Sequence, residues 1–300
     1  MPNFEIRAAR SGDAAGVVAL RAEIHPYLVR GEHATRHTIT APPTAEQWGC
    51  FVAVRAGEVV GWVAGLRNLG SAEPDFGQIL QLQVHPSYRC RGIGGALFTA
   101  VTDHLRSIGI RRTAALTTPE ALDFARRRGL EPTREVRYSA LDLSPLVSPP
   151  VPPVGIRLVP LIDISAHDLY AADRLATADE PGDTPTAPIP FDSWRQDVWD
   201  NPDLDRSAST VAMAGDDPIG YSLILRDGHR AWSDMTATVP AFRGRGVALA
   251  AKTAALLRAA EHGVTVAYTA NDESNVAMLA VNARLGYRPI ARQFSGVITL

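Results

Sequence analysis

The sequence predicts an α/β protein made of two similar domains in tandem. Three observations lead to this prediction. A strand–glycine loop–helix segment occurs twice, the order of strands and helices around it is the same in both halves, and a proline-rich stretch separates the halves. The first segment is Leu82–Gly94 and the second is Thr236–Ala248. A chain of 300 residues is long enough for two cores at about 150 residues each.

The composition is that of a soluble globular protein, with 46% hydrophobic and 21% charged residues. A net charge of −2 gives no bulk attraction to nucleic acid or to an anionic membrane. No apolar run approaches the ~20 residues that span a bilayer, and the N-terminus lacks a signal-peptide pattern. Two cysteines, Cys50 and Cys90, fit a reducing compartment. We therefore expect a cytoplasmic monomer or homodimer without nucleic-acid or membrane partners.

The first half, residues 1–143, alternates between strand and helix patterns. Period-2 alternation bounded by turn residues predicts strands at 4–8, 51–55, 59–66, 78–84, 112–116 and 136–143. Apolar spacing and capping residues predict helices at 14–23, at 95–107, and from Thr118 to Gly129. Residues 24–47 are poorly periodic and contain several prolines, so we expect an irregular segment there.

Residues 144–155 carry five prolines and no periodic pattern, which predicts an extended linker. The second half, residues 156–300, then repeats the order of the first, with a long irregular segment at 179–205 and a last strand at 293–299. Matching positions such as Pro86 and Pro240, or Gly129 and Gly286, identify an internal repeat. Its period is far too long for a solenoid, so two tandem domains are predicted.

Each glycine loop joins a strand to the start of a helix and reads Arg-x-x-Gly-x-Gly in one half and Arg-x-x-Gly-x-Ala in the other. Glycine lets the backbone approach a ligand closely, and a helix N-terminus offers unpaired N–H groups and partial positive charge. A tight turn without a ligand would explain one such loop. Two copies with the same flanking elements favour phosphate binding.

These two segments resemble those of the Gcn5-related N-acetyltransferase (GNAT) family. The stretch from Thr269 to Pro289 is similar to that family's second cofactor-side segment. The resemblance covers nearly the whole chain as two copies, in a layout similar to tandem members such as mycothiol synthase and some antibiotic-pathway acetyltransferases. It implies that each domain has a mixed, mostly antiparallel sheet flanked by helices.

The resemblance also implies acetyl-CoA as the acyl donor and no metal. The pyrophosphate would lie on a glycine loop, and the pantetheine would pair like an extra strand with the strand before it. Asn275 matches a family position that contacts pantetheine, although a helix N-cap explains it as well. The cofactor-binding residues implied are Leu82, Gln83, Val84, Arg89, Cys90, Arg91, Gly92, Ile93, Gly94, Thr236, Ala237, Thr238, Arg243, Gly244, Arg245, Gly246, Val247, Ala248 and Asn275.

The two halves differ at the position where many family members carry a carboxylate, six residues before the loop proline. Asp234 stands there in the second half and Leu80 in the first. The acceptor is an alkylammonium with a pKa of roughly 10, which must lose a proton before its nitrogen can attack, and of these two residues only Asp234 can accept that proton. We therefore expect residues 156–300 to be catalytic, and residues 1–143 to bind cofactor without turnover or to serve mainly as a packing partner. A strand-end carboxylate bound to a loop remains an equal explanation of Asp234.

The general acid is not identified by the resemblance. Many members place a tyrosine four residues before the last helix's glycine, but Ala125 and Asn282 occupy those positions here. The thiolate would leave unassisted, take a proton from water, or use another residue such as Tyr268.

The expected function is transfer of acetyl from acetyl-CoA to the primary amine of a small molecule by direct attack on the thioester. A mycothiol-synthase-like acetyltransferase and a non-catalytic CoA-binding regulator or scaffold remain alternatives. The acceptor would be selected by the segments 24–47 and 179–205.

Overall fold

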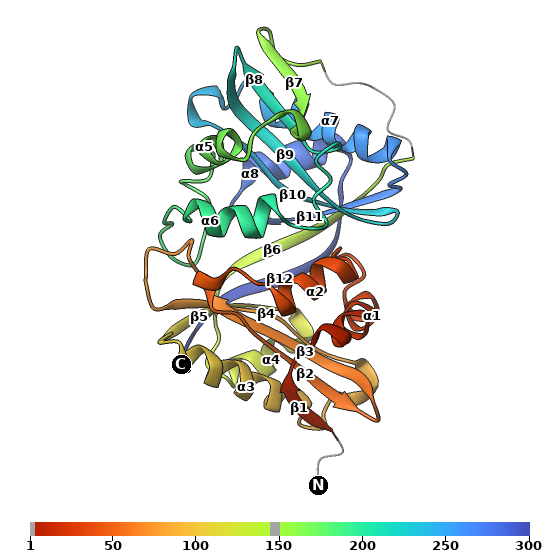
Figure 1. Ribbon diagram of the computed structural model, residues 1–300, viewed down its shortest axis with the longest axis vertical. Helices are drawn as coiled ribbons and strands as arrows, with labels where there is room; N and C mark the ends of the chain where they lie inside the picture. The colour runs from red at the N-terminus through yellow and green to blue at the C-terminus, as the bar shows by residue number, and fades with distance from the viewer. Residues whose placement is uncertain (1–3, 145–150) are drawn as a thin grey trace. The chain divides into compact units, whose positions relative to one another are not determined.

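The computed structural model describes residues 4–144 and 151–300 (Figure 1). Contacts divide the described chain into two compact units. Unit 1 holds the residues up to Val136, together with Gly182–Ile189 and Arg292–Leu300. Unit 2 holds Arg137–Pro181 and Pro190–Ala291. Each unit therefore receives a short piece of chain from beyond its own half of the sequence.

The sheet of unit 1 is mixed and mostly antiparallel. Neighbouring strands run antiparallel except for the pair β4–β5, which is parallel. The C-terminal part of β12 completes this sheet beside β5, with Phe294 opposite Thr117 and Thr299 opposite Arg112. In order, the strands are β1 (Glu5–Ala8), β2 (Gly49–Arg55), β3 (Glu58–Arg67), β4 (Phe76–Val84), β5 (Arg112–Thr117) and β12 (Arg288–Thr299).

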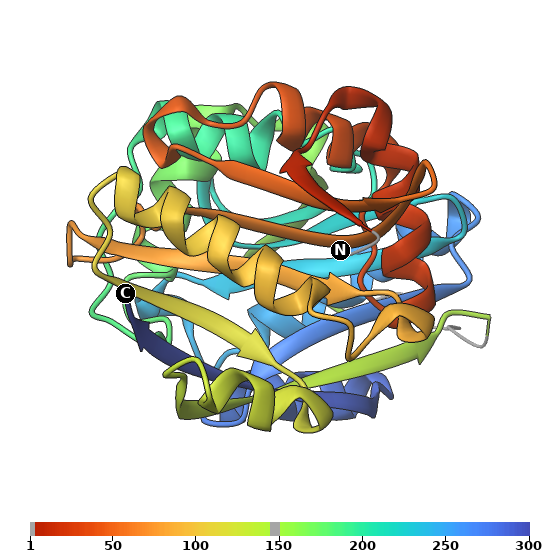
Figure 2. The same cartoon turned by 90° about the horizontal axis from the view of Figure 1, so that it is seen from below.

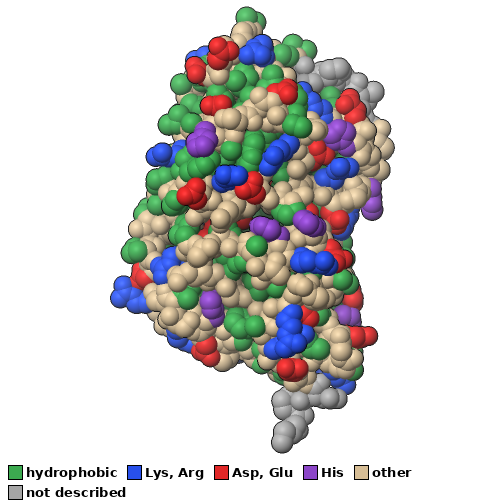
Figure 3. All heavy atoms as spheres, viewed as in Figure 1, with side chains coloured by type: hydrophobic (Ala, Val, Ile, Leu, Met, Phe, Trp, Pro, Cys, Tyr) green, Lys and Arg blue, Asp and Glu red, His purple; other side chains and the backbone are tan. Residues whose placement is uncertain are grey.

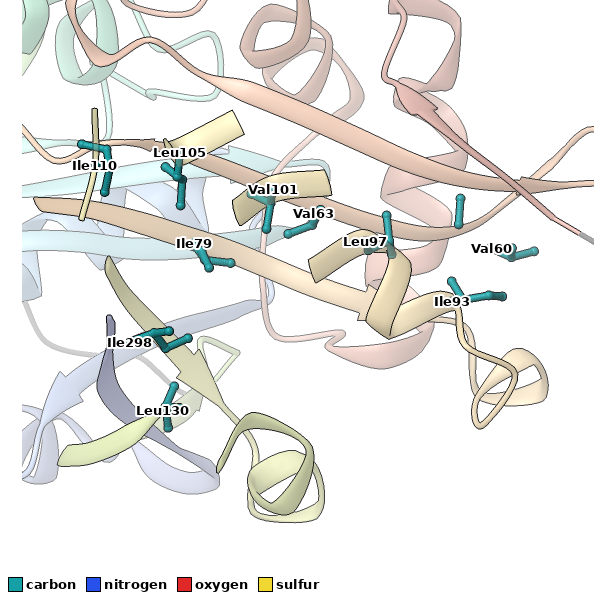
Figure 4. Packing of buried hydrophobic residues seen from close by; sticks show 11 residues of the cluster. Val60, Val63, Ile79, Ile93, Leu97, Val101, Leu105, Ile110, Leu130 and Ile298 are labelled. Atoms are coloured by element: carbon teal, nitrogen blue, oxygen red, sulfur yellow. The ribbon is translucent and has the colours of Figure 1, made fainter. Parts of the chain in front are cut away.

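Helices cover both faces of the unit 1 sheet, because alternate strand residues point to opposite sides. Trp62 packs with helix α1 (Ala14–Ile24), whereas its neighbour Val63 packs with helix α3 (Ile93–Ser107). Figure 2 shows α3 lying along the strands, with the short helix α4 (Leu122–Arg126) near it. Figure 4 shows the core on the α3 side, where Leu97, Val101 and Leu105 meet strand residues that include Ile79.

Helix α2 (Glu32–Thr40) lies in the segment that was expected to be irregular. Its buried face consists of Ala34, Thr35 and Thr38, which are small or polar. This face carries no strong apolar period, so the helix could not be recognised from the pattern.

Unit 2 repeats the arrangement, with β10 and β11 as its parallel pair. Its strands are β7 (Ile156–Pro160), β8 (Thr210–Ala214), β9 (Asp217–Asp227), β10 (Arg230–Thr238) and β11 (Val266–Asp272), followed in the hydrogen-bonding order by β6 (Glu131–Asp142). Its helices are α5 (Ala166–Ala176), α6 (Phe191–Trp194), α7 (Val247–Glu261) and α8 (Val276–Leu285). The predicted fold class, mixed and mostly antiparallel sheets flanked by helices, is confirmed.

The last strand differs from the expectation in one respect. The pattern placed 293–299 with the second half of the chain, whereas Arg292–Leu300 belongs to unit 1. Alternation of apolar and polar residues reports which face of a strand is buried but not which strand lies beside it.

Of the predicted linker 144–155, residues 145–150 lie outside the described residues, and the linker remains a prediction.

Asp183 ties the short piece Gly182–Ile189 into unit 1. It accepts hydrogen bonds from Arg134 (Nε 3.0 Å, Nη2 2.9 Å), from Thr133 (2.6 Å) and from Ser295 (2.7 Å). Burial alone would raise the pKa of Asp183, but the hydrogen bonds from Arg134, Thr133 and Ser295 outweigh it, so the pKa is lowered. Its carboxylate therefore stabilises unit 1.

We expect Asp183→Asn to lower the free energy of unfolding by about 2–3 kcal/mol at pH 7, since it leaves Arg134 without its charged partner. Because the folded pKa is depressed, this stabilisation is present above about pH 4 and is lost as the pH falls through the folded pKa. Urea denaturation at pH 7 and at pH 3 should therefore show the wild-type advantage shrinking in acid. Glu32→Gln is the control, because Glu32 pairs with Arg36 at an exposed site. An equal loss in both variants would contradict the assignment.

Candidate active site

The two glycine loops have the same backbone geometry. Gly92 and Gly246 have φ values of 86° and 82° and precede α3 and α7. Two residues earlier, Cys90 and Gly244 also have positive φ values, of 58° and 73°. Left-handed backbone at these places turns the chain from the strand into the helix, which is why glycine is favoured there.

Both loops leave main-chain donors open. Within the described part of the chain, no acceptor pairs with the N–H groups of residues 90–94 or 244–248. A Cβ added at Gly92, Gly244 or Gly246 would meet no atom within 4 Å, so the space beside these glycines is open. Unpaired N–H groups at a helix N-terminus, with room beside them, suit the pyrophosphate of a nucleotide cofactor.

The first arginine of each loop, Arg89 or Arg243, holds the preceding strand rather than projecting into the open space. Arg243 donates from Nε to the Thr238 carbonyl (3.0 Å) and from Nη2 to the Ala176 carbonyl (3.0 Å) and to Asp179 (2.7 Å). Arg89 donates in the same way from Nε to the Val84 carbonyl (3.2 Å). The Asp179 carboxylate raises the pKa of Arg243, and Arg243 lowers that of Asp179. Arg243 is therefore held by protein partners, whereas the main-chain N–H groups of residues 244–248 remain open to a phosphate.

Of the residues with positive φ in the two loops, Cys90 is the one that is not glycine, and its backbone is therefore strained. The equivalent residue of the other loop is Gly244. Left-handed backbone costs a non-glycine residue roughly 1–2 kcal/mol, and the greater freedom of glycine in the unfolded chain offsets part of that. We therefore expect Cys90→Gly to raise the free energy of unfolding by about 0.5–1 kcal/mol. Cys90→Ala removes the thiol but keeps the strain and should give no gain in the same denaturation experiment. Equal stabilities of the two variants would contradict this origin of strain.

The strand before each loop carries a β-bulge. In unit 2 the register of β10 against β9 shifts between Ser233 and Thr236, which leaves Asp234 and Met235 outside regular pairing. The pairing of β3 with β4 shifts one residue later in unit 1, between Leu80 and Gln83, and Gln81 there has a φ of 53°. Bulges re-aim side chains and release main-chain groups at functional sites.

Asp234 lies at the bulge of β10 and is exposed. Its Oδ1 accepts a hydrogen bond from the indole Nε1 of Trp232 at 3.1 Å, so the carboxylate is oriented rather than freely rotating. Tyr221, on the neighbouring strand β9, is fully buried, and burial followed by the charge of Asp173 raises its pKa, with Asp234 adding to the shift. The Asp234 carboxylate is thus within electrostatic range of the Tyr221–Asp173 pair.

The strands β10 and β11 separate just beyond this point. Their last paired residues are Trp232 and Tyr268, after which the Thr269 hydroxyl donates to the Ser233 carbonyl at 3.0 Å. Beyond the separation, Asn282 of α8 donates from Nδ2 to Asn271 Oδ1 of β11 at 2.6 Å. The Asn275 side chain caps α8 by accepting from Met278 N–H at 3.1 Å. The N-cap interpretation of Asn275 therefore accounts for its oxygen, and contact with pantetheine stays a prediction.

Several buried polar atoms at these elements have no hydrogen-bond partner among the described residues. In the strands predicted to pair with pantetheine, these are both amide atoms of Gln83 in unit 1 and Oγ1 of Thr238 in unit 2. The others in unit 2 are Ser233 Oγ, Asn282 Oδ1 and Tyr287 Oη. Buried groups of this kind are normally paired, so each is a candidate for contact with a ligand.

Sequence reasoning missed a set of buried polar residues in unit 2, which we call the fork cluster: Ser233, Lys252, Thr269 and Tyr287. The cluster is linked by contacts. Thr269 bonds to the main chain of Ser233, the Ser233 hydroxyl faces that of Tyr287 closely enough to affect its pKa, and Lys252 Nζ lies 4.9 Å from the centre of the Tyr287 ring. Aligning the two halves residue by residue would have found the cluster, because its counterparts in unit 1 are apolar.

The acidic residues of the segment 179–205 are partly accounted for by arginines. Asp179 binds Arg243 in unit 2, and Asp183 binds Arg134 in unit 1, so neither is free to attract a cationic substrate. Trp194 is buried against Tyr170 of α5 and serves the core. Figure 3 shows positive and negative side chains interspersed over the face in view, without a basic field for nucleic acid.

The described residues contain no group of three or more His, Cys, Asp or Glu arranged to hold a metal ion. Among the same residues, no helix is both long and apolar enough to cross a membrane.

The family model for the acetyltransferase (GNAT) family matches residues 17–130 and, a second time, residues 170–287. The chain belongs to the GNAT family. It is therefore an N-acetyltransferase of tandem architecture, and the resemblance drawn from the glycine loops is confirmed. Each matched range contains one glycine loop and ends just before one of the long strands β6 and β12. Members of this family use acetyl-CoA as acetyl donor.

Relatives of known name are similar along most of the chain. Over 286 residues the chain is 25% identical to a mycothiol acetyltransferase of Catenulispora acidiphila, covering 91% of this chain and 87% of the relative. Over 299 residues it is 29% identical to a mycothiol acetyltransferase of Salinispora arenicola, covering 93% and 87%.

Two solved structures are similar in fold. A tandem GNAT protein from the clavulanic acid biosynthesis pathway has a TM-score of 0.76 at 22% identity, covering 99% of this chain and 98% of that one. A GCN5-related N-acetyltransferase from Sphaerobacter thermophilus has a TM-score of 0.74 at 19% identity, covering 100% and 96%.

Proposed function

We propose that unit 2 transfers the acetyl group of acetyl-CoA to the primary amine of a small molecule. The observation that carries the proposal is the pairing, within one unit, of an open N–H loop with a carboxylate at the adjacent strand bulge. The loop 243–248 would hold the pyrophosphate, and the strand Thr236–Thr238 would pair with the pantetheine. Main-chain donors would bind acetyl-CoA, and the proposal includes no metal.

In the proposed reaction the amine nitrogen attacks the thioester carbonyl carbon, an N–C bond forms, and the C–S bond breaks. The Asp234 carboxylate accepts the proton that the amine loses, which is general base catalysis. Main-chain N–H groups released by the bulge would stabilise the oxyanion. The departing thiolate takes up a proton, so that free CoA and the N-acetylated acceptor are the products.

Unit 1 is proposed to bind acetyl-CoA without turning it over. Its loop 89–94 has the same open donors, and the unpaired Gln83 amide offers a polar contact. Leu80 at the position of Asp234 cannot accept a proton. A role as packing partner only is the alternative for this unit.

A second candidate is a mycothiol-synthase-like activity, which the two relatives similar along most of the chain favour. It would use a cysteinyl conjugate of glucosamine and inositol as the acceptor. The sequence neither requires nor excludes this acceptor, and the absence of an acid at Asn282 favours instead the non-catalytic CoA-binding alternative.

Release of free CoA thiol, measured against a panel of primary amines that includes this conjugate, tests the proposal. We expect acetyl-CoA-dependent turnover with at least one amine above the rate without acceptor. Calorimetric titration that shows acetyl-CoA binding, with no turnover for any amine, would instead support a CoA-binding regulator or scaffold.

We further infer a cytoplasmic location and a monomeric or homodimeric state. The two free cysteines support the reducing compartment.

A further inference from the structure

The fork cluster can be compared with the equivalent residues of unit 1, because the two units share their strand pairing and turn hydrogen bonds around these positions. Gly65 pairs with Ile79 in unit 1 as Ile224 pairs with Ser233 in unit 2. Leu130 N–H donates to the Ala125 carbonyl as Tyr287 N–H donates to that of Asn282. Helices α3 and α7 have the same length and follow equivalent glycines, which places Lys252 at the position of Phe98.

At these equivalent positions unit 1 is apolar throughout. Ser233, Lys252, Thr269 and Tyr287 of unit 2 correspond to Ile79, Phe98, Ala115 and Leu130, and Asn282 corresponds to Ala125. All five unit 1 residues belong to or pack against one hydrophobic cluster, in which Figure 4 shows Ile79 and Leu130. Apolar side chains at these positions are therefore compatible with the fold. The polar side chains of unit 2 are not required by the fold, which indicates a functional role.

The polar set is costly to the folded state. Lys252 is 1% exposed, and burial is the cause that lowers its pKa; among the described residues that pack against α7, Tyr287 is the titratable group that faces it, and no carboxylate does. Burial raises the pKa of Tyr287, which the nearby Ser233 hydroxyl opposes, yet neither hydroxyl forms a hydrogen bond within the described chain. Unpaired buried hydroxyls and a buried ammonium each cost free energy.

The fork cluster lies where a functional role would account for this cost in free energy. Ser233 precedes Asp234 at the bulge, and Thr269 lies where β10 and β11 part, which is where the proposed function puts the thioester. Positive charge, and O–H groups without a hydrogen-bond acceptor among the described residues, suit a group that becomes negative during reaction.

We propose that the fork cluster receives the thioester of acetyl-CoA in unit 2, with the Tyr287 and Ser233 hydroxyls donating hydrogen bonds to it and Lys252 acting as a positioning residue through the Tyr287 ring. The inference rests on the proposed function of unit 2. As the C–S bond breaks, the donors stabilise the charge that develops on the thioester. The proton lost by the amine goes to Asp234, and the thiolate is protonated from solvent.

Tyr287→Phe removes one hydroxyl, and Lys252→Met removes the charge at nearly constant length. We expect each variant to lower kcat at least tenfold while KM for acetyl-CoA changes less than threefold. The midpoint of thermal unfolding should stay the same or rise, since unpaired polar groups are removed. Thr102→Val, which replaces a buried hydroxyl bonded to the Phe98 carbonyl in α3 of unit 1, is the activity control and should keep kcat within twofold.

A kcat within twofold of the wild type for both Tyr287→Phe and Lys252→Met, at equal or higher stability, would overturn the inference and leave the cluster a structural feature. The two proposals fail in different ways. Absence of turnover in the wild type counts against the proposed function, whereas an active wild type with unaffected variants counts against the fork cluster alone.

Discussion

Lys252→Met is expected to stabilise the protein by up to about 5 kcal/mol below pH 7, which is the largest stability effect that this structure predicts. Burial lowers the pKa of Lys252 from 10.5 to about 7. Below pH 7 the folded and unfolded states both hold the ammonium, so the full cost of burying the charge falls on the wild type.

The lowered pKa of Lys252 determines whether the free energy of unfolding rises or falls with pH. Between about pH 7 and 10.5 the unfolded wild type binds more protons than the folded one, so wild-type stability rises with pH across that range. The advantage of Lys252→Met should therefore be large at pH 6 and mostly lost at pH 10. Urea denaturation of both proteins at the two pH values measures it. A difference that does not change with pH would show that the ammonium is not buried as described.

Asp234→Asn is expected to give the largest loss of activity, about 100-fold or more in kcat at pH 7, because general base catalysis contributes at least that factor. The loss should shrink as the pH approaches the pKa of the acceptor amine, since the amine then deprotonates without help. KM for acetyl-CoA should change little, because the carboxylate is exposed at the bulge and lies outside the loop that would bind phosphate.

The matched control is Leu80→Asn, which places the same side chain at the equivalent position of unit 1. We expect its kcat within twofold of the wild type. A kcat of the Asp234→Asn variant equal to that of the wild type, combined with a lowered kcat of the Leu80→Asn variant, would indicate that unit 1 is the catalytic unit.

The loop geometry could be predicted from the sequence because it is local. Gly92 and Gly246 have the positive φ that the motif requires, and each is followed at once by a helix. The strand and helix patterns in both halves are also local, because they show which face of each element is buried. Together with the family resemblance they predicted the fold class. Helix α2 escaped prediction because its buried residues are alanine and threonine.

The features that could not be predicted are those formed between distant residues. The partner of the final strand depends on tertiary packing, which alternation alone does not specify. Ser233, Lys252 and Tyr287 come from β10, α7 and the turn after α8, and only the fold brings them together. The only signal in the sequence was the comparison of the two halves, in which each polar residue of the cluster stands opposite an apolar one, such as Lys252 opposite Phe98.

The central claim is that acetyl-CoA reacts on the loop of unit 2, and Gly246→Ala tests it most directly. The added methyl group would enter the open space beside the loop N–H groups, where the pyrophosphate is proposed to bind. Gly263→Ala is the matched control, because Gly263 has a φ of 85°, open surroundings and a place in unit 2 far along the chain from the loop. Both substitutions carry the same backbone strain.

The measurement is kcat/KM for acetyl-CoA, followed by CoA thiol release at a saturating concentration of the best amine. We predict a loss of at least tenfold for Gly246→Ala and a value within twofold of the wild type for Gly263→Ala. Equal values of kcat/KM for Gly246→Ala, Gly263→Ala and the wild type would contradict the claim.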